Sequence, residues 1–152
     1  QPQKEDVIWD LFAGHGNFSM PLARRCQHVS AVEVQADMVS SLQRQAESLA
    51  LSLHAIEADL SNSGVLAHLP APDKVLLDPP RAGAAALMQE LNARKVSQVL
   101  YVSCDAATLA RDLSTLAAAG YQIEKAGIMD MFPQTHHVET MVLLSYRDKR
   151  RG

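Results

Sequence analysis

The sequence predicts an open α/β sheet that is mostly parallel and has an antiparallel last strand. Five pairs of a strand-forming run and a helix-forming run follow one another, the first between Val7 and Ala23, and two closely linked strand-forming runs end the chain. Strands that alternate with helices form parallel sheets, whereas strands joined by a short connection pair in antiparallel fashion.

The first strand and helix are joined by a glycine turn. Residues 7–11 form the strand, Gly14 and Gly16 lie in the turn, and residues 19–23 open the helix. At the carboxyl end of a parallel strand, such a turn lets a cofactor approach the backbone near free N–H groups. Ser19 stands where a dinucleotide fingerprint needs its third glycine, which favours a small nucleoside cofactor such as S-adenosylmethionine. An ordinary tight turn is an equal alternative.

Hydrophobic periodicity predicts the other elements. The expected strands are 29–33, 53–57, 74–78 and 98–103, followed by the final pair 123–129 and 138–146. The expected helices are 36–51, a weak one at 60–69, 84–93, and 106–118, which Gly120 ends. The helix at 36–51 carries its apolar stripe on Val39, Leu42, Ala46 and Leu49.

Composition indicates a single domain over residues 1–152, which we expect to be part of a longer protein because the chain starts with Gln1. The 152 residues are 47% hydrophobic, enough for one core. No apolar run could span a membrane and no signal peptide is visible, so we expect a cytoplasmic protein. The net charge of −3 argues against binding nucleic acid by phosphate contacts alone.

Three carboxylates follow predicted strand ends. Glu33 can accept both ribose hydroxyls of an adenosine cofactor, although such a residue is often only solvated. Asp59 can meet the adenine amino group or cap the weak helix that follows. Asp78 precedes Pro79 and Pro80, which stiffen the chain and fix the site of this carboxylate.

Cys104 lies between a strand and a helix. A thiol at a helix N-terminus meets the positive end of the dipole, which favours the nucleophilic thiolate. Most lone cysteines are buried hydrophobic residues, but the place of Cys104 after a strand end favours function. Cys26 and Cys104 are too few for a disulfide framework or a zinc motif.

His136 and His137 would face opposite sides of a strand, so we expect no metal site.

Four linked segments resemble the RNA uracil C5-methyltransferases, especially the bacterial members that methylate 23S ribosomal RNA. They are DLFAGHGNF (10–18), LDPPRAG (77–83), VSCDAATLARD (102–112), and DMFP with HVE (130–139). The resemblance implies a Rossmann-like class I methyltransferase with a seven-stranded sheet, S-adenosyl-L-methionine as cofactor, and a ribosomal RNA substrate bound by a monomer. That family carries a β-barrel RNA-binding domain and an iron–sulfur cluster upstream, and we expect the cluster only there.

The resemblance also implies roles for single residues. Contacts to the cofactor fall on Phe12, Gly14, Asn17, Glu33, Asp59 and Asp78. The nucleophile is Cys104 and the general base is Glu139, while Phe132 and the loop at 78–80 are candidates to hold a flipped uracil. Asp105 stands where the family usually has Asn, and a carboxylate disfavours a neighbouring thiolate unless it is engaged as the helix N-cap.

These residue types suit the chemistry of uracil. A thiolate that adds to C6 creates electron density at C5, which then takes a methyl group before a base removes the C5 proton. A transfer-RNA uracil C5-methyltransferase shares this logic. Three further alternatives are an amino-group methyltransferase, in which Arg81 would replace a stacking aromatic residue, an NAD-dependent oxidoreductase, and a non-catalytic RNA-binding module.

Overall fold

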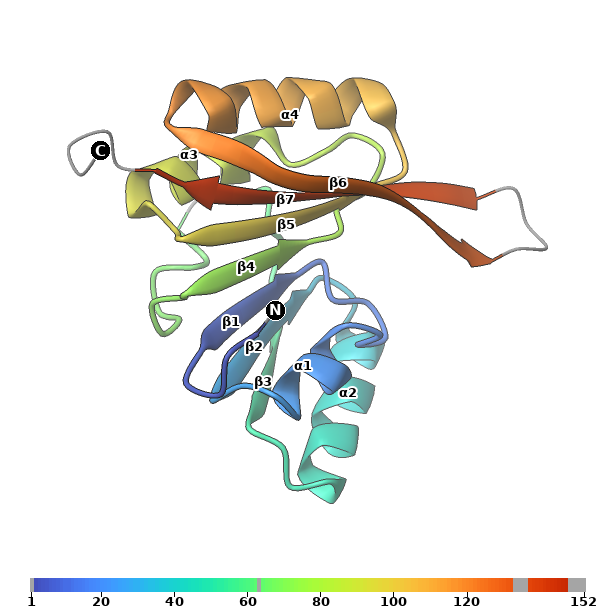
Figure 1. The fold of residues 1–152 in the computed structure, drawn as a ribbon. Coiled ribbons are helices and arrows are strands. Elements are labelled where there is room, and N and C mark those ends of the chain that lie inside the picture. The colour runs from blue at the N-terminus through green and yellow to red at the C-terminus, as the bar shows by residue number, and fades with distance from the viewer. Residues whose placement is uncertain (1, 63, 133–136, 148–152) are drawn as a thin grey trace. The chain divides into compact units, whose positions relative to one another are not determined.

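The computed structural model of the protein describes residues 2–62, 64–132 and 137–147, leaving out the side chains of 129–132, 137 and 138. Its seven strands form a mixed sheet with four helices among these residues (Figure 1). The elements are β1 (Val7–Leu11), α1 (Ser19–Ala23), β2 (His28–Glu33), α2 (Ala36–Ser48), β3 (Leu53–Glu57), β4 (Lys74–Leu77), α3 (Ala85–Arg94), β5 (Gln98–Ser103), α4 (Ala106–Ala118), β6 (Tyr121–Phe132) and β7 (His137–Tyr146). The predicted α/β class is confirmed.

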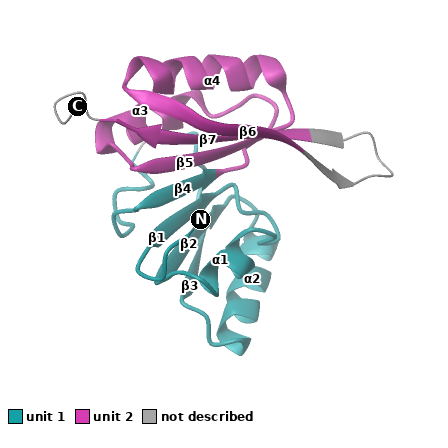
Figure 2. Cartoon of the chain, viewed as in Figure 1, with its two compact units in different colours: residues 1–76 teal, residues 77–152 magenta. Residues whose placement is uncertain are grey.

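The chain divides into two compact units, residues 1–76 and 77–152 (Figure 2). In the first unit, β1 pairs with β2 and β2 with β3, both in parallel. In the second unit, β7 pairs with β5 and with β6, both in antiparallel fashion, as predicted for the end of the chain. That residues 1–152 act as one catalytic domain stays a prediction.

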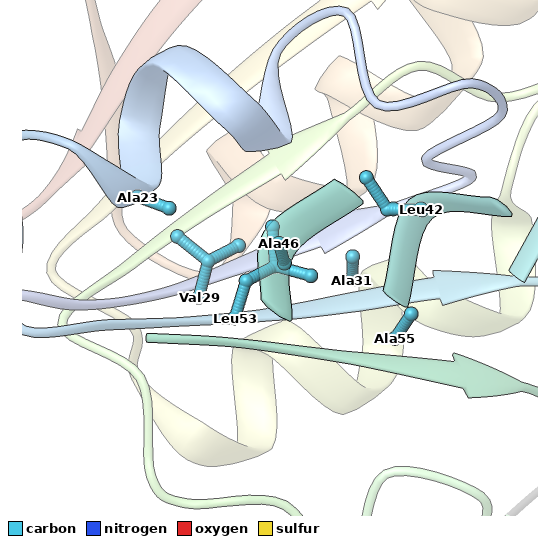
Figure 3. Close-up of a cluster of buried hydrophobic side chains, with 7 residues drawn as sticks. All are labelled: Ala23, Val29, Ala31, Leu42, Ala46, Leu53 and Ala55. Carbon is cyan, nitrogen blue, oxygen red and sulfur yellow. The ribbon is translucent and has the colours of Figure 1, made fainter. Parts of the chain in front are cut away.

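Small apolar side chains form the core between α1, α2 and the strands β2 and β3 (Figure 3). They are Ala23, Val29, Ala31, Leu42, Ala46, Leu53 and Ala55. The predicted stripe of α2 is therefore confirmed at Leu42 and Ala46. Leu49 is instead 50% exposed, because α2 ends at Ser48 and Ala50 adopts a left-handed φ of 53°. The helix was predicted too long at this end.

The weak helix predicted at 60–69 is wrong, because the described residues between β3 and β4 form turns. Asp59 accepts hydrogen bonds from the backbone N–H and the hydroxyl of Ser61, at 2.9 and 2.7 Å. Serine, asparagine and glycine favour such local turns over helix. The indole N–H of the buried Trp9 donates to the carbonyl of Pro70 at 2.8 Å, which fixes the segment that leads into β4.

The second unit is held together by α3, α4 and the strands β5 to β7. The hydroxyl of the buried Tyr121 donates to the carbonyl of Val96 at 2.7 Å and lies 3.3 Å from that of Leu91. These bonds connect the start of β6 to the end of α3. Both final strands, β6 and β7, are longer than predicted. Their backbone pairing continues past the apolar runs from which the sequence predicted the strand ends.

Candidate functional site

The glycine turn after β1 has the backbone that a cofactor loop requires. Phe12, Gly14 and Gly16 all have positive φ, at 64°, 58° and 83°. A Cβ at Gly16 would collide with the side chain of Leu42, so only glycine fits there. A Cβ at Gly14 would meet no atom within 4 Å, so this side of the turn is open. The turn therefore has the positive-φ backbone that the sequence predicts and an open side at Gly14.

Glu33, at the end of β2, holds this turn through its carboxylate. One oxygen accepts the N–H of Gly14 at 3.1 Å, and the other accepts the N–H of Gln35 at 2.8 Å. Each oxygen keeps a lone pair, so the carboxylate remains able to accept two ribose hydroxyls. The structure thus brings Gly14 and Glu33 together, as the cofactor prediction requires, while Asn17 is exposed beside them on the same turn.

Asp10 and Ser19 form a buried pair that the sequence did not reveal as a unit. The hydroxyl of Ser19 donates to the carboxylate of Asp10, and both side chains are almost fully buried. Ser19 stands where a dinucleotide fingerprint would have its third glycine. The pair connects the end of β1 to the first residue of α1, so the departure from the glycine pattern has a structural use. The sequence features that could have indicated this pair are an acid near the end of the first strand and a serine at the start of the helix that follows.

The antiparallel register in the second unit brings the predicted nucleophile and base to the same end of the sheet. Ser103, the last residue of β5, pairs with Thr140 on β7. Cys104 follows Ser103 and Glu139 precedes Thr140, so both residues adjoin this pair at the same end of the two strands. Cys104 is exposed, while Glu139 is half-buried. Among the residues that the structure describes, Glu139 Oε2 is buried without a hydrogen-bond partner.

Asp105 caps α4, which is the alternative role that the sequence left open for it. Its carboxylate accepts the N–H groups of Ala107 and Thr108, both at 3.0 Å. These bonds, first that from Thr108, lower the pKa of Asp105 below its ordinary value. The hydroxyl of Ser103 donates to the carbonyl of Asp105 at 2.8 Å and accepts its N–H at 3.0 Å, which fixes the turn containing Cys104. The carboxylate beside the thiol is therefore engaged with the helix.

We expect Asp105→Ala to lower the midpoint of thermal unfolding by a few degrees, because two N–H groups of α4 lose their acceptor. Asp105→Asn, which restores the family's usual residue, keeps an acceptor oxygen and should match the parent midpoint to within about 1 °C. Both midpoints can be measured by circular dichroism. An equal loss in the two variants would contradict a capping role.

Asp78 follows β4 and is half-buried. Burial, and then the negative charge of Glu139, raise the pKa of Asp78 to about 6. The structure therefore brings these two carboxyl groups within electrostatic reach of each other inside the second unit. Sequence reasoning assigned them to different tasks and missed their proximity, because the 60 residues of chain between them give no signal of it.

This shift predicts a pH-dependent stability. A pKa that is higher in the folded than in the unfolded state means that ionised Asp78 destabilises the fold, and that the penalty disappears as pH falls through about 6. Asp78→Asn should therefore be more stable than the parent, and this gain should be about 1 kcal/mol larger at about pH 7.5 than at about pH 4.5, because solvent screens a half-buried carboxyl. Urea unfolding at both pH values measures this difference. The same difference at both would mean that Asp78 has an ordinary pKa.

The remaining residues that the sequence predicted for a site either make other contacts or lie outside the residues that the structure describes. Asp59 is exposed and accepts a hydrogen bond from the backbone N–H of Ser61, and its contact with the cofactor stays a prediction. The side chains of Phe132 and His137, and all of His136, lie outside the described residues. Within the part of the chain that is described, no three His, Cys, Asp or Glu residues are grouped to hold a metal. No described helix is long and apolar enough to cross a membrane.

Known proteins resemble this chain over nearly its whole length. The 23S rRNA (uracil(1939)-C(5))-methyltransferase RlmD of Marinomonas posidonica is 48% identical over 146 residues, and that of Hahella chejuensis is 46% identical over 150 residues. Both matches cover 94% of this chain, but 33% and 34% of the relatives. The chain therefore spans about a third of the length of these curated relatives.

Solved structures share its fold. The tRNA (uracil-54, C5)-methyltransferase of Pyrococcus abyssi, in complex with S-adenosyl-L-homocysteine, has a TM-score of 0.79 and 31% identity, covering 93% of this chain and 34% of that one. The magnesium protoporphyrin IX methyltransferase of Synechocystis, with a TM-score of 0.74, is 16% identical and covers 95% of this chain and 71% of that one. The predicted Rossmann-like class I methyltransferase fold is confirmed.

The family follows from a sequence match that includes the predicted nucleophile and base. The model of the tRNA (Uracil-5-)-methyltransferase family matches residues 64–147, more than half of the chain. This range contains the Asp78 loop, Cys104 and Glu139, so it coincides with most of the second unit. The chain belongs to the tRNA (Uracil-5-)-methyltransferase family, as its motifs predicted.

Proposed function

We propose that this chain is the catalytic part of an enzyme that transfers a methyl group from S-adenosyl-L-methionine to C5 of a uridine in 23S ribosomal RNA. The family match supports uracil C5 chemistry, and the relatives at 46 to 48% identity support ribosomal RNA as the substrate. The solved tRNA enzyme, at 31% identity, makes transfer RNA the second candidate.

One observation carries the proposal: Cys104 and Glu139 each adjoin the same residue pair of β5 and β7. Ser103 pairs with Thr140, Cys104 follows Ser103, and Glu139 precedes Thr140. Cys104 is exposed and can reach a base that is flipped out of an RNA strand. Glu139 carries a buried oxygen without a hydrogen-bond partner among the described residues, so it is available to take a proton.

The two residues perform complementary steps. The thiolate of Cys104 forms a bond to C6 of uracil, and the C5–C6 π electrons move into an enolate. C5 then bonds to the methyl group, and the electron pair of the broken methyl–sulfur bond would remain on the sulfur of the cofactor. Glu139 removes the proton that remains on C5, the electron pair of that C–H bond restores the C5–C6 double bond, and the bond to Cys104 breaks to regenerate the thiolate. The reaction returns the nucleophile unchanged and leaves a proton on Glu139.

The first unit contains residues that suit S-adenosyl-L-methionine. Gly14 has an open side, and Glu33 retains acceptor capacity for ribose hydroxyls. We assign Phe12, Gly14, Asn17, Glu33, Asp59 and Asp78 to this cofactor on the family resemblance of the sequence. The bound cofactor supplies an electrophilic methyl group on a sulfonium. A monomeric state and a cytoplasmic location stay predictions.

The proposal can be tested by covalent trapping. The protein that carries this chain, at its natural length, is mixed with S-adenosyl-L-methionine and a 23S ribosomal RNA fragment that contains 5-fluorouridine. Fluorine at C5 leaves no proton for Glu139 to remove, so the covalent intermediate should persist and add the mass of the methylated RNA to the intact protein.

Two comparisons sharpen this test. A transfer RNA fragment with 5-fluorouridine should react more slowly than the ribosomal fragment, and the reverse order would favour the second candidate. Calorimetry measures S-adenosyl-L-methionine binding separately, with NAD as the control ligand. Tight cofactor binding without an adduct on either RNA would overturn uracil C5 methylation by this route.

A further inference from the structure

Asp112 is a charged side chain inside the second unit, and only 1% of its surface is exposed. One carboxylate oxygen accepts the hydroxyl of Tyr101 at 2.5 Å and the backbone N–H of Ala84 at 2.9 Å. The other oxygen accepts two N–H groups of the Arg111 guanidinium, both at 3.2 Å. Burying a carboxylate costs free energy unless it is paired and hydrogen-bonded, so these four bonds maintain its position.

The partners of Asp112 come from three separate segments. Tyr101 lies on β5, three residues before Cys104, and Arg111 lies on α4. Ala84 ends the loop that begins after Asp78. Arg111 reaches this loop as well, because its guanidinium donates to the carbonyl of Ala82 at 2.8 Å. The loop is therefore held to α4 and, through Asp112, to β5.

Gly83 allows this loop to approach α4 closely. A Cβ at this position would lie 2.5 Å from Arg111 Nη2 and 2.8 Å from Asp112 Oδ2, and the φ of 79° also disfavours a side chain. The burial of Tyr101, followed by its bond to Asp112, raises the pKa of its hydroxyl, so Tyr101 remains a donor. Residues 82–84 of the loop therefore pack closely against Arg111 and Asp112.

We propose that Asp112, with Tyr101 and Arg111, positions the loop that carries Asp78 relative to the strand and helix that carry Cys104. These three residues contact neither the nucleophile nor the base through any bond described above. Their effect on catalysis rests on the proposed function and is indirect. A displacement of about 1 Å in a reacting group can slow a reaction by about a hundredfold, so a loosened loop should reduce the rate of the covalent step.

A pair of matched substitutions tests the inference. Arg111→Met and Arg147→Met remove side chains of the same type, each at least half exposed and each in one ion pair, with Asp112 and Glu124 respectively. In the natural-length protein at saturating RNA, Arg111→Met should form the 5-fluorouridine adduct about ten to a hundred times more slowly. Arg147→Met should react at the parent rate and bind S-adenosyl-L-methionine within about twofold of the parent.

Arg111→Lys separates positioning from attraction of the RNA backbone. Lysine keeps the charge but cannot form the planar fork that joins Asp112 to Ala82. Under the proposal, Arg111→Lys stays slow at saturating RNA, and Tyr101→Phe is slow as well. Recovery of the parent rate in Arg111→Lys, with a changed KM for RNA and a changed salt dependence only, would identify Arg111 as a phosphate contact and overturn the proposal.

Hydrogen exchange keeps this inference distinguishable from the proposed function. In Arg111→Met, the amides of Gly83 and Ala84 should exchange about ten times faster, while that of Ala13, which donates to Val32 in the first unit, should not change. If the parent forms no adduct, the uracil C5 proposal fails, and exchange alone decides whether the loop is held. Unchanged exchange at both loop amides would refute the positioning role.

Discussion

Cys104→Ala should abolish methylation, lowering turnover by about 10⁴-fold or more, because the proposed covalent step depends on its thiol. Alanine retains the backbone between Ser103 and Asp105, whose hydrogen bonds do not involve the thiol. The variant should therefore fold and bind S-adenosyl-L-methionine as the parent does. Turnover is measured by transfer of a labelled methyl group to 23S ribosomal RNA.

Cys26→Ala is the matched control for this result. Cys26 is half-buried in the first unit, and its thiol donates to the carbonyl of His28. Burial raises the pKa of this thiol, which keeps it protonated and unreactive. Cys26→Ala should retain full turnover and the 5-fluorouridine adduct, while Cys104→Ala loses both. Appreciable methylation by Cys104→Ala would exclude the covalent mechanism.

Glu139→Gln should accumulate a covalent protein–RNA adduct on natural RNA. The nucleophile and the methyl transfer are left intact, but glutamine cannot accept the C5 proton, so Cys104 is not released. Turnover should fall by about 10² to 10⁴-fold, and a band of higher mass should appear on a denaturing gel. The adduct should contain the methyl group, which distinguishes an arrest after transfer from an arrest before it.

Glu124→Gln provides the control for a change of charge in the same unit. Glu124 lies on β6, is exposed, and pairs with Arg147 at 3.0 Å. This variant should turn over at the parent rate without an adduct. If Glu139→Gln instead loses turnover with no trapped RNA, Glu139 acts before the covalent step and another group removes the proton.

Local sequence determined most of the elements and the residue types of the site. The positive-φ glycines of the turn, the cap at Asp105 and the strand ends near Glu33 and Cys104 depend on residues close together in the chain, so their signals can be read along the sequence. The same reasoning failed at 60–69, where turn-forming serine, asparagine and glycine outweighed a weak helical pattern.

The tertiary structure decided which distant residues meet. The proximity of Asp78 to Glu139 depends on where β4 ends and β7 begins, and the register of β5 and β7 decides that Cys104 and Glu139 adjoin the same residue pair. A shift of that register by one residue would turn Glu139 to the other face of the sheet. The hydrogen bonds of Asp112 and Arg111 likewise connect β5, α4 and the loop after Asp78, which no periodic pattern in the sequence relates to one another. Sequence thus specified the groups, while long-range hydrogen bonding and burial decided their arrangement, because these energies depend on contacts between residues far apart in the chain.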